Sequence, residues 1–502
     1  MLDRFSTFTL AASGGLALAY IVLSEILTRK RRRVTSNISC GTSFLGADVF
    51  SSTPKKCIII GGGVSGLLVA FICKERGIPF ELYEKSSERV GGLLGSTLIL
   101  SNDGKEIGLA EQAANGVMWT PEVERLCEKI GIPLGMGEDG VVSPKSTAKA
   151  RFFVRQGKMV QFPLSIMEIL HVLCWRMWQL PSSDRVFETM EEYLSFYFGN
   201  TMTRQLLEPA FSGIFGTTLD RLSLQGTTEI FPKLLNYSVS FPLALTKYLW
   251  YSVWEGKKVK QTVRKPGTQS FKFGMQQFIN ALTNYVGREN IFYGSAVEKL
   301  SQFGTDTNII LTTPAHVSCE ILRNSFSDLS QWQKELIHLL EKIDYTPIIT
   351  CTIIMERRKL PGLKPGFGCL LPRNEGLSLL GVLFNSDIFE NRVKDEGNYI
   401  SLTTILQDTE LESTDESVKR LILSELSTLF SNGSYLDEDS VQSMKLFRWR
   451  HGIPQYSPTL SQSWPVMDSL LKQHLPNVNL FGNYTGQISI RGMIREAMKK
   501  VM

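Results

Sequence analysis

The sequence has few features typical of a metal-binding, disulfide-bonded or nucleic-acid-binding protein. The eight cysteines form no CxxC pair and the five histidines are scattered, so no spacing typical of a metal site is present. We interpret the cysteines as free, mostly buried thiols in a compartment that need not be oxidising. The net charge of +5 arises largely from the basic residues 29–33. The rest of the chain is nearly neutral, which argues against a nucleic-acid partner.

Long apolar runs are also scarce, and residues 8–27 are the stretch best suited to span a bilayer. They hold one acid, Glu25, and the basic residues 29–33 follow them directly. The positive-inside rule then places the rest of the chain on the cytoplasmic or matrix-like side. We therefore expect a membrane-associated protein with a single N-terminal span. In a eukaryotic cell, the mitochondrial inner membrane is one candidate location.

Other interpretations of the apolar segments stay open. Residues 28–47 are rich in arginine and serine and contain no acid, which is typical of an organelle-targeting segment. A secretory signal has the least support, because the positive charge lies on the wrong side of the apolar run. A second apolar segment, residues 164–180, fits either a core helix or an interfacial helix that contacts membrane lipid.

The first regular pattern after the linker is a strand, a turn and a helix. Residues 56–60 form a short apolar run that predicts a buried parallel strand. A glycine-rich turn follows, then residues 67–76 at helical spacing and a second strand at residues 80–84. Together they make a βαβ unit of about 30 residues, which is typical of a dinucleotide-binding domain.

The glycine-rich turn contains the residues that a dinucleotide needs. Gly61 allows the tight turn, Gly63 lets a diphosphate approach the backbone, and Gly66 lets the helix pack close to the sheet. The diphosphate would lie at the start of the helix, against the N–H groups of Val64 and Ser65, where the helix dipole favours anions.

An acid ends the second strand. Glu84 can accept hydrogen bonds from both ribose hydroxyls, which argues against a 2′-phosphate and so against NADP. Lys85 follows it directly, and we expect both residues to belong to the cofactor site.

The residues just past this acid resemble a known family. Residues 88–92 read Glu-Arg-Val-Gly-Gly, which is similar to the Arg-x-Gly-Gly of FAD-dependent amine oxidases, desaturases and protoporphyrinogen oxidases. The resemblance implies that the cofactor is FAD and that Arg89 compensates phosphate charge. Gly91 and Gly92 would let the backbone pass close to the cofactor.

The carboxy-terminal residues 480–490 resemble the flavin segment of the same family. There, N–H groups at the start of the last helix face the pyrimidine end of the flavin and stabilise negative charge on its reduced form. The resemblance assigns this site to Gly482, Ile488, Ser489 and Ile490. It also implies that Val297 contacts the adenine through its main chain, and that residues 312–316 form a strand returning to the nucleotide domain.

Further motifs occur in the order found in protoporphyrinogen oxidases, and they extend the resemblance over nearly all residues from 56 to 502. These motifs are residues 207–216, 271–276, 366–372, 380–386 with 389–392, and 453–456. They imply an enzyme of tetrapyrrole or heme biosynthesis that converts protoporphyrinogen IX to protoporphyrin IX by hydride transfer to flavin N5. Oxygen or a quinone would reoxidise the flavin. The cofactor performs the redox step, so we assign no catalytic side chain.

Two departures from the family keep an alternative open. Residues 457–460 lack the family's Gly-His pair, and residues 111–118 lack the arginine that holds a substrate propionate in several members. Asn115 could replace that arginine, while Phe367 and Gly368 either line the substrate pocket or belong to the core. The alternative is a desaturase or amine oxidase acting on another hydrophobic molecule, such as an isoprenoid. A flavin-bearing scaffold without turnover is a third class.

The expected fold is mixed α/β, with a Rossmann-type FAD-binding domain, an interleaved substrate domain and a helical membrane-associating region, preceded by the apolar N-terminal segment. The length of 502 residues suggests two or three domains. We assign residues 55–118, 261–318 and 451–502 to FAD binding, 119–260 to the helical substrate region, 319–450 to the substrate sheet, and 1–54 to the anchor or targeting segment. The oligomeric state stays open, with a homodimer as one option.

Periodicity predicts further elements along the chain. Helices are expected at residues 121–130, 191–207, 277–285, 417–430 and 491–502. Strands are expected at residues 345–356, 377–385 and 479–481, and within 291–300.

Overall fold

The computed structural model describes residues 23–24, 56–101, 103–135, 139–161, 179–182, 185–227, 240–256, 263–304, 306–407, 413–432 and 434–501. The predicted N-terminal span and the apolar segment 164–180 lie almost wholly outside these residues, so both stay predictions. Within the described ranges, no helix combines the length and the apolar character that crossing a bilayer requires.

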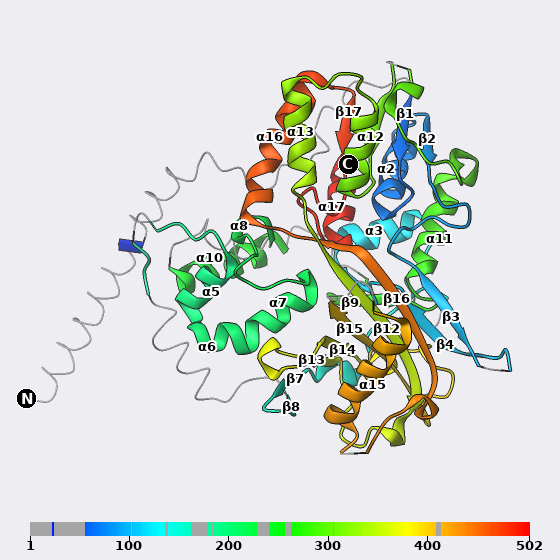
Figure 1. Cartoon of the computed structure of the whole chain (residues 1–502), viewed down its shortest axis with the longest axis vertical. Coiled ribbons are helices and arrows are strands. Elements are labelled where there is room, and N and C mark those ends of the chain that lie inside the picture. Colours follow the sequence, from blue (N-terminus) through cyan, green and yellow to red (C-terminus); the bar gives the residue numbers. More distant parts are fainter. Residues whose placement is uncertain are drawn as a thin grey trace, which may run out of the picture.

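A parallel sheet of five strands occupies the upper half of the molecule in Figure 1. Its order is β10 (Ile291–Phe292), β2 (Phe80–Tyr83), β1 (Cys57–Ile60), β11 (Asn308–Leu311) and β17 (Val478–Leu480). All four residues of β1 are buried, as in a parallel sheet that is covered on both faces. The strands come from the start, the middle and the end of the described chain. The sheet therefore closes only when distant segments meet.

Helices cover both faces of this sheet. One face packs against α2 (Val64–Glu75), α3 (Pro121–Lys129), α11 (Met275–Val286) and α17 (Ile490–Val501). The other face packs against α12 (Ala315–Asn324), α13 (Gln331–Glu341) and α16 (Pro458–His474). The result is the doubly wound arrangement that the βαβ pattern predicts.

A second sheet of seven strands fills the lower half of Figure 1. Its order is β16 (Val441–Pro454), β12 (Tyr345–Glu356), β15 (Tyr399–Gln407), β14 (Leu379–Leu383), β13 (Gly368–Leu370), β7 (Phe152–Arg155) and β8 (Lys158–Gln161). The helix α15 (Asp415–Phe430) packs on it through a shared core. The predicted strand at residues 345–356 is confirmed as β12. The strand β16 continues to Pro454, beyond the predicted segment boundary at residue 450.

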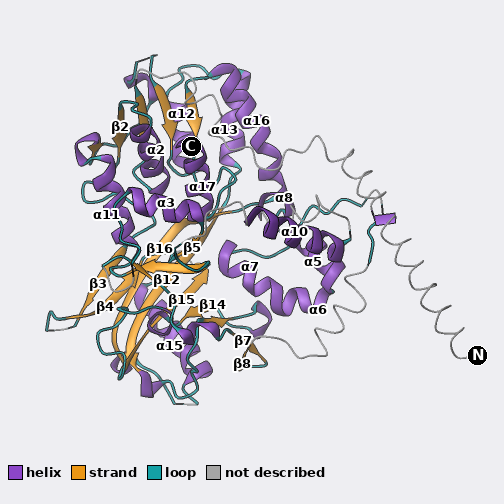
Figure 2. Cartoon of the chain, turned by 180° about the vertical axis from the view of Figure 1, so that it is seen from behind, coloured by secondary structure: helices purple, strands orange, loops and turns teal. Residues whose placement is uncertain are grey.

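A group of helices lies to one side of both sheets, at the right of Figure 2. It contains α5 (Met190–Phe198), α6 (Asn200–Met202), α7 (Glu208–Phe215), α8 (Leu224–Thr227) and α10 (Phe241–Gly256). The single helix predicted at residues 191–207 is wrong, because Gly199 has a φ of +82° and ends α5. Residues Thr203–Leu207 then form a π-helical turn that leads into α7.

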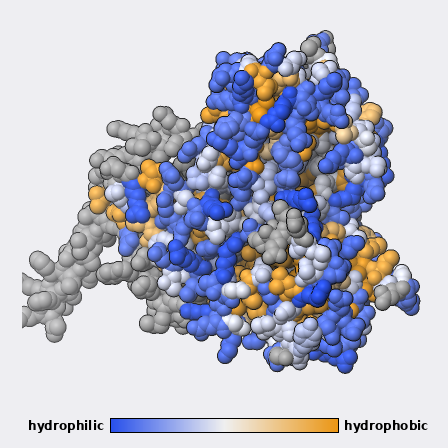
Figure 3. Space-filling view, viewed as in Figure 1, coloured by the Kyte–Doolittle hydropathy of each residue, from blue (hydrophilic) through white to orange (hydrophobic). Residues whose placement is uncertain are grey.

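Two small sheets join the large ones. The hairpin of β3 (Ser96–Leu100) and β4 (Glu106–Glu111) projects from the molecule, and the strands β5 (Val117–Trp119), β9 (Gly267–Phe271) and β6 (Val141–Val142) pair beside it. Leu98 and Leu100 on β3 are each 56% exposed. Figure 3 shows a largely hydrophilic surface that is interrupted by apolar patches.

One predicted strand is displaced. Residues 312–316 were expected to return the chain to the nucleotide domain as a strand. The returning strand is instead β11, which ends at Leu311, and Ala315 already begins α12. Pro314 precedes the helix and lacks a donor N–H, which suits the start of a helix rather than a ladder.

Candidate functional site

The glycine-rich turn leads from β1 into α2, and its geometry explains each glycine. Gly61 has a φ of +106°, which side chains rarely allow. A Cβ on Gly66 would lie 1.9 Å from the Gly61 carbonyl oxygen, so α2 packs too close for any side chain there. A Cβ on Gly63 would instead meet nothing nearer than the Gly92 Cα, at 4.0 Å. The space in front of Gly63 is therefore open to a ligand.

The start of α2 is suited to an anion. Gly63 is its N-cap and offers no side-chain cap, and the first turn, which begins with Val64 and Ser65, contains no acid. The amino end of a helix carries unsatisfied N–H groups and the positive end of the dipole. The geometry thus fits the diphosphate that the sequence pattern predicts at this point.

The Glu84 carboxylate lies at the carboxyl end of β2, beside this turn. Its Oε2 accepts a hydrogen bond from the Gly62 N–H at 2.7 Å, and its Oε1 accepts one from the Ser86 N–H at 2.8 Å. Two main-chain donors therefore fix its orientation. A carboxylate has about four acceptor positions, so two remain for ribose hydroxyls. Lys85 follows with an exposed side chain.

The segment that contains Arg89 folds back over the turn. The Gly91 N–H donates to the Gly62 carbonyl at 2.8 Å, which holds the segment against the turn. The Arg89 guanidinium donates to the carbonyl of Gly92 at 2.6 Å and to Gln112 Oε1 at 2.6 Å. No ion pair between described residues involves Arg89. Burial lowers its pKa while the Glu84 charge acts to raise it. Its charge is therefore available to a phosphate.

The carboxy-terminal segment meets the same turn from the other end of the chain. Ser65 Oγ on α2 donates to Met493 Sδ on α17 at 3.2 Å, across 428 residues of sequence. The amino ends of α2 and α17 therefore lie side by side. Trp464 Nε1 donates to the Tyr484 carbonyl at 2.8 Å and Tyr456 donates to the Asn483 carbonyl, which fixes the loop before α17.

The predicted flavin residues lie in and around this loop. Gly482 is buried and its N–H donates to Thr485 Oγ1 at 3.2 Å. Ile488 is half-buried and contacts the helical region, and Ile490 begins α17. Ser489 Oγ accepts the Gly492 N–H at 3.0 Å and so caps the helix. The structure brings these residues to the glycine-rich turn, while their contacts with a flavin stay a prediction.

The segment that contains Val297 runs beside the end of β2. The Gly294 N–H donates to the Ser86 carbonyl at 3.0 Å, and the Ser295 N–H donates to the Glu84 carbonyl at 2.8 Å. Val297 itself is buried. A pocket of about 460 Å³ is lined by Val297 together with Ile58, Tyr83 and Phe303 among others. None of the glycines of the turn lines it.

The side chain of Asn115, the predicted substrate residue, lies in a network of polar groups. Its Nδ2 donates to Asn385 Oδ1 at 3.1 Å, and its carbonyl accepts from Ser270 Oγ at 2.9 Å. Its Oδ1 is buried and has no hydrogen-bond partner in the described part of the chain. Asn385 in turn donates to Thr403 Oγ1 at 2.8 Å. Asn115 therefore links the cofactor side of the molecule to the large sheet.

Phe367 and Gly368 lie close to the same network. The Phe384 N–H donates to the Phe367 carbonyl at 3.1 Å, and Asn385 is the next residue. The Arg151 guanidinium lies 4.7 Å from the centre of the Phe367 ring. A Cβ on Gly368 would lie 2.4 Å from the Val382 carbonyl oxygen. Close pairing of β13 and β14 thus explains this glycine, and its predicted contact with substrate stays untested.

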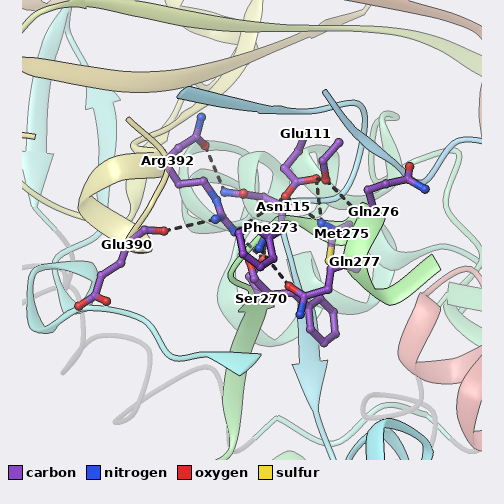
Figure 4. A network of polar contacts seen from close by, with 12 residues as sticks. Glu111, Asn115, Ser270, Phe273, Met275, Gln276, Gln277, Glu390 and Arg392 are labelled. Carbon is purple, nitrogen blue, oxygen red and sulfur yellow. Dashed lines mark hydrogen bonds and ion pairs between the residues drawn. The ribbon is translucent and has the colours of Figure 1, made fainter. Parts of the chain in front are cut away.

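Arg392 and Glu111 form a buried ion pair that was not predicted from the sequence, and it lies close to the Asn115 network (Figure 4). Arg392 Nη2 lies 3.8 Å from Glu111 Oε1, with the two side chains 0% and 4% exposed. Arg392 also donates to Ser270 Oγ at 2.7 Å, and its Nε has no partner among the described residues. Burial raises the pKa of Glu111 and lowers the pKa of Arg392. Each charge offsets the desolvation of the other.

Glu111 also explains a motif. Its Oε1 accepts the Met275 N–H at 3.1 Å, and Ser96 Oγ donates to its Oε2 at 2.6 Å while accepting the Gln276 N–H. The carboxylate thus caps α11 at its positive end. Gly274 precedes the helix with a φ of +74°, where a Cβ would meet Ser96 Oγ at 2.3 Å. The residues 271–276 therefore form a helix start that is specific for this buried acid.

The described cysteines agree with the expected free thiols. Cys57, Cys73, Cys127, Cys319, Cys351 and Cys369 are buried and unpaired. No three His, Cys, Asp or Glu side chains of the described residues gather in a way that could hold a metal ion.

Comparisons with known proteins identify the family to which the chain belongs. The model of the flavin-containing amine oxidoreductases matches residues 64–499. Protoporphyrinogen oxidase 2 (chloroplastic/mitochondrial) of Arabidopsis thaliana is 25% identical in an alignment 513 positions long, gaps included, and the alignment covers 89% of this chain and 92% of that protein. Coproporphyrinogen III oxidase of Bacillus subtilis is 20% identical in an alignment of 470 positions that covers 86% of this chain and 94% of that protein. The solved structure of a protein from Exiguobacterium sp. 255-15 has the same fold, with a TM-score of 0.65, 18% identity and coverage of 89% and 99%.

The geometry of the site and the family match therefore indicate the same cofactor. The open space at Gly63, the oriented Glu84 carboxylate and the charge of Arg89 fit FAD, which is the cofactor of the matching family. The chain belongs to the family of flavin-containing amine oxidoreductases and is an FAD-dependent oxidoreductase, most similar to the protoporphyrinogen oxidases.

Proposed function

We propose that this protein oxidises a porphyrinogen, with protoporphyrinogen IX as substrate and protoporphyrin IX as product. The observation that carries the proposal is its likeness, along nearly the whole length of both chains, to a relative named for this reaction. Relatives named for coproporphyrinogen III make that molecule the nearest competing substrate. Because the identities are 20–25% in these relatives, the choice between the two rests on the assay below.

Arg151 supports a substrate that carries carboxylates. Its side chain is exposed and lies over the half-buried ring of Phe367, and no ion pair between described residues involves it. A porphyrinogen combines a large apolar macrocycle with propionate groups, so it needs both an apolar wall and a cation. We infer that Arg151, just before β7, takes the role of the arginine missing from residues 111–118. This inference favours a porphyrinogen over an isoprenoid as the substrate.

We assign orientation and electrostatics to the chain rather than acid–base chemistry. When bound, FAD supplies a hydride acceptor at flavin N5. The start of α2 would hold the diphosphate with Arg89, and Glu84 would hold the ribose. The start of α17 would place its helix dipole at the other end of the cofactor, where it favours negative charge. Phe367 and Arg151 would hold the macrocycle and one of its propionates.

The test is an assay of the purified holoprotein with protoporphyrinogen IX and, in parallel, coproporphyrinogen III. Porphyrin fluorescence and flavin absorbance are followed together. We expect porphyrin to form faster than autoxidation with one of them, together with reduction of the flavin. Porphyrin formation at the autoxidation rate with both substrates would end the proposal. Reduction by an amine or isoprenoid instead would favour the alternative class.

Location and electron acceptor are part of the same proposal. We infer that residues 8–27 anchor the protein in a membrane with its catalytic part on the cytoplasmic or matrix-like side, and that oxygen or a quinone reoxidises the flavin. Relatives with mitochondrial and chloroplastic names support an organelle. Removal of the residues before Lys55 should release protein from membranes. Complete retention would point to residues 164–180 as the membrane contact.

A further inference from the structure

Two histidines stack where the two large sheets approach each other. His316 lies in the first turn of α12 and His451 lies in β16, with ring centres 3.8 Å apart and planes inclined by 28°. The ring of Tyr345, at the start of β12, is nearly perpendicular to both, at 6.0 Å and 5.8 Å. Tyr345 also accepts the Ala315 N–H at 2.9 Å. The cluster therefore connects a helix of the cofactor sheet to two strands of the other sheet.

The loop that leads into α12 packs against the glycine-rich turn. Thr312 Oγ1 is within hydrogen-bond distance of the carbonyls of Ile60 and Gly61, at 2.9 and 2.7 Å. A Cβ on Gly61 would lie 3.0 Å from Thr313 Cγ2, so this loop packs directly against the turn. His316 follows only a few residues later. A displacement of His316 would therefore be passed to the residues that hold the diphosphate.

The electrostatic surroundings favour the neutral form of His316. The positive end of the α12 dipole, His451 from β16 and Lys85 from the loop after β2 all oppose a proton there, and Glu320 on α12 is the acid that favours it. Tyr345 stays protonated, because burial raises its pKa. Burial is the largest cause of the lowered pKa of His316, followed by His451. The Nδ1 atom of His316 is buried and has no hydrogen-bond partner among the described residues.

The sign of the pH effect follows from these shifts. A histidine whose pKa is lowered by folding contributes stability that is present above its unfolded pKa of about 6.5 and is lost as the pH falls toward the folded pKa. His451 and Lys85 also disfavour a charge on His316. Acid should therefore weaken the contact between α12 and β16.

We propose that the His316–His451 stack is a pH-sensitive brace that couples the cofactor turn to the substrate sheet and loosens the hold on FAD on acidification. The brace acts through Thr312 and Thr313, which contact Gly61. It acts on FAD binding itself and so does not depend on which substrate the enzyme oxidises.

The test measures the release rate of FAD from the holoprotein by the rise of flavin fluorescence, at about pH 7.5 and about pH 5. In the wild type we expect release to be about tenfold faster at the lower pH, because a proton on His316 is disfavoured in the folded protein. The double variant His316→Phe with His451→Phe keeps two stacked rings without a titratable group, and its release rate should change less than about threefold between the two pH values. His451→Lys removes the stacked ring and adds a charge that does not titrate in this range, so it should release FAD quickly at both pH values.

His474→Phe is the matched control. His474 stacks on Trp332 with ring centres 4.6 Å apart, at a distance from the turn along α16, so this variant should keep the wild-type pH dependence. Should the double phenylalanine variant not retain FAD, His316→Gln with His451→Gln makes the same comparison. Equal pH dependence in the wild type and the neutral variant, or slow release from His451→Lys at the higher pH, would overturn the proposal.

Discussion

Replacing Gly63 with alanine separates the cofactor role of the turn from its role in folding. Gly63 has a φ of −67° and a ψ of 178°, which alanine adopts without strain. The added methyl would lie 4.0 Å from the nearest atom, the Gly92 Cα, so the protein without FAD has room for it. An alanine N-cap costs about 0.5–1 kcal/mol and the reduced freedom of the unfolded chain returns about 0.4–1 kcal/mol. We therefore expect the free energy of unfolding of the apoprotein to change by less than about 1 kcal/mol.

The same methyl would occupy the space in front of the helix start. Loss of one charge-assisted hydrogen bond to the diphosphate costs about 1.5–3 kcal/mol, or a Kd for FAD that is roughly 10 to 150 times higher. The assays are titration of apoprotein with FAD, followed by quenching of flavin fluorescence, and urea unfolding of the apoprotein. Gly66→Ala is the contrast, because its methyl would lie 1.9 Å from the Gly61 oxygen and should destabilise the apoprotein by about 3 kcal/mol or more. Wild-type affinity in Gly63→Ala, or apoprotein destabilisation as large as in Gly66→Ala, would refute the reasoning.

Three further substitutions test other parts of the site. Arg392→Met leaves Glu111 buried without its counter-charge and should lower the free energy of unfolding by about 3–5 kcal/mol in urea, whereas Arg392→Lys should cost less; equal costs would argue against a charge effect. Glu84→Gln loses one acceptor and turns an N–H toward a main-chain donor, so FAD titration should show roughly ten- to hundredfold weaker binding, and an unchanged Kd would contradict the ribose assignment. Arg151→Ala should raise the KM for porphyrinogen roughly tenfold with FAD affinity unchanged, and an unchanged KM would remove Arg151 from the substrate site.

The cofactor half of the site could be predicted because its signals are local. Gly61, Gly63 and Gly66 each answer a steric demand of one turn, and Glu84 ends the strand beside it. The carboxy-terminal segment was recognisable only by resemblance. Its approach to the turn, through Ser65 and Met493, is a tertiary contact that no local pattern encodes.

The buried Glu111–Arg392 pair could not be predicted, because the two residues are far apart in the sequence and neither has an unusual local context. Glu111 ends a strand and was interpreted only as part of a segment that lacks arginine. Arg392 was noted only as the last residue of the motif at residues 389–392. Their pairing, and the capping of α11 by Glu111, depend on how β4, β9 and α11 meet.

Secondary structure shows the same division. The strand at residues 345–356 was predicted with its full length, because apolar and β-branched residues dominate it as far as Met355. The helix predicted at residues 191–207 was too long, since the break at Gly199 was not weighed as a terminator. Arg151 escaped notice because the expected place for a propionate partner was residues 111–118, and only the fold brings its strand to Phe367.

The most direct test of the account is anaerobic mixing of the FAD-loaded protein with protoporphyrinogen IX, with flavin absorbance and porphyrin fluorescence recorded on the same sample. We predict that the flavin band is bleached while porphyrin fluorescence rises, and that the band returns when an electron acceptor is admitted. An oxidised flavin spectrum that stays unchanged, with porphyrin appearing only on exposure to air at the autoxidation rate, would contradict it.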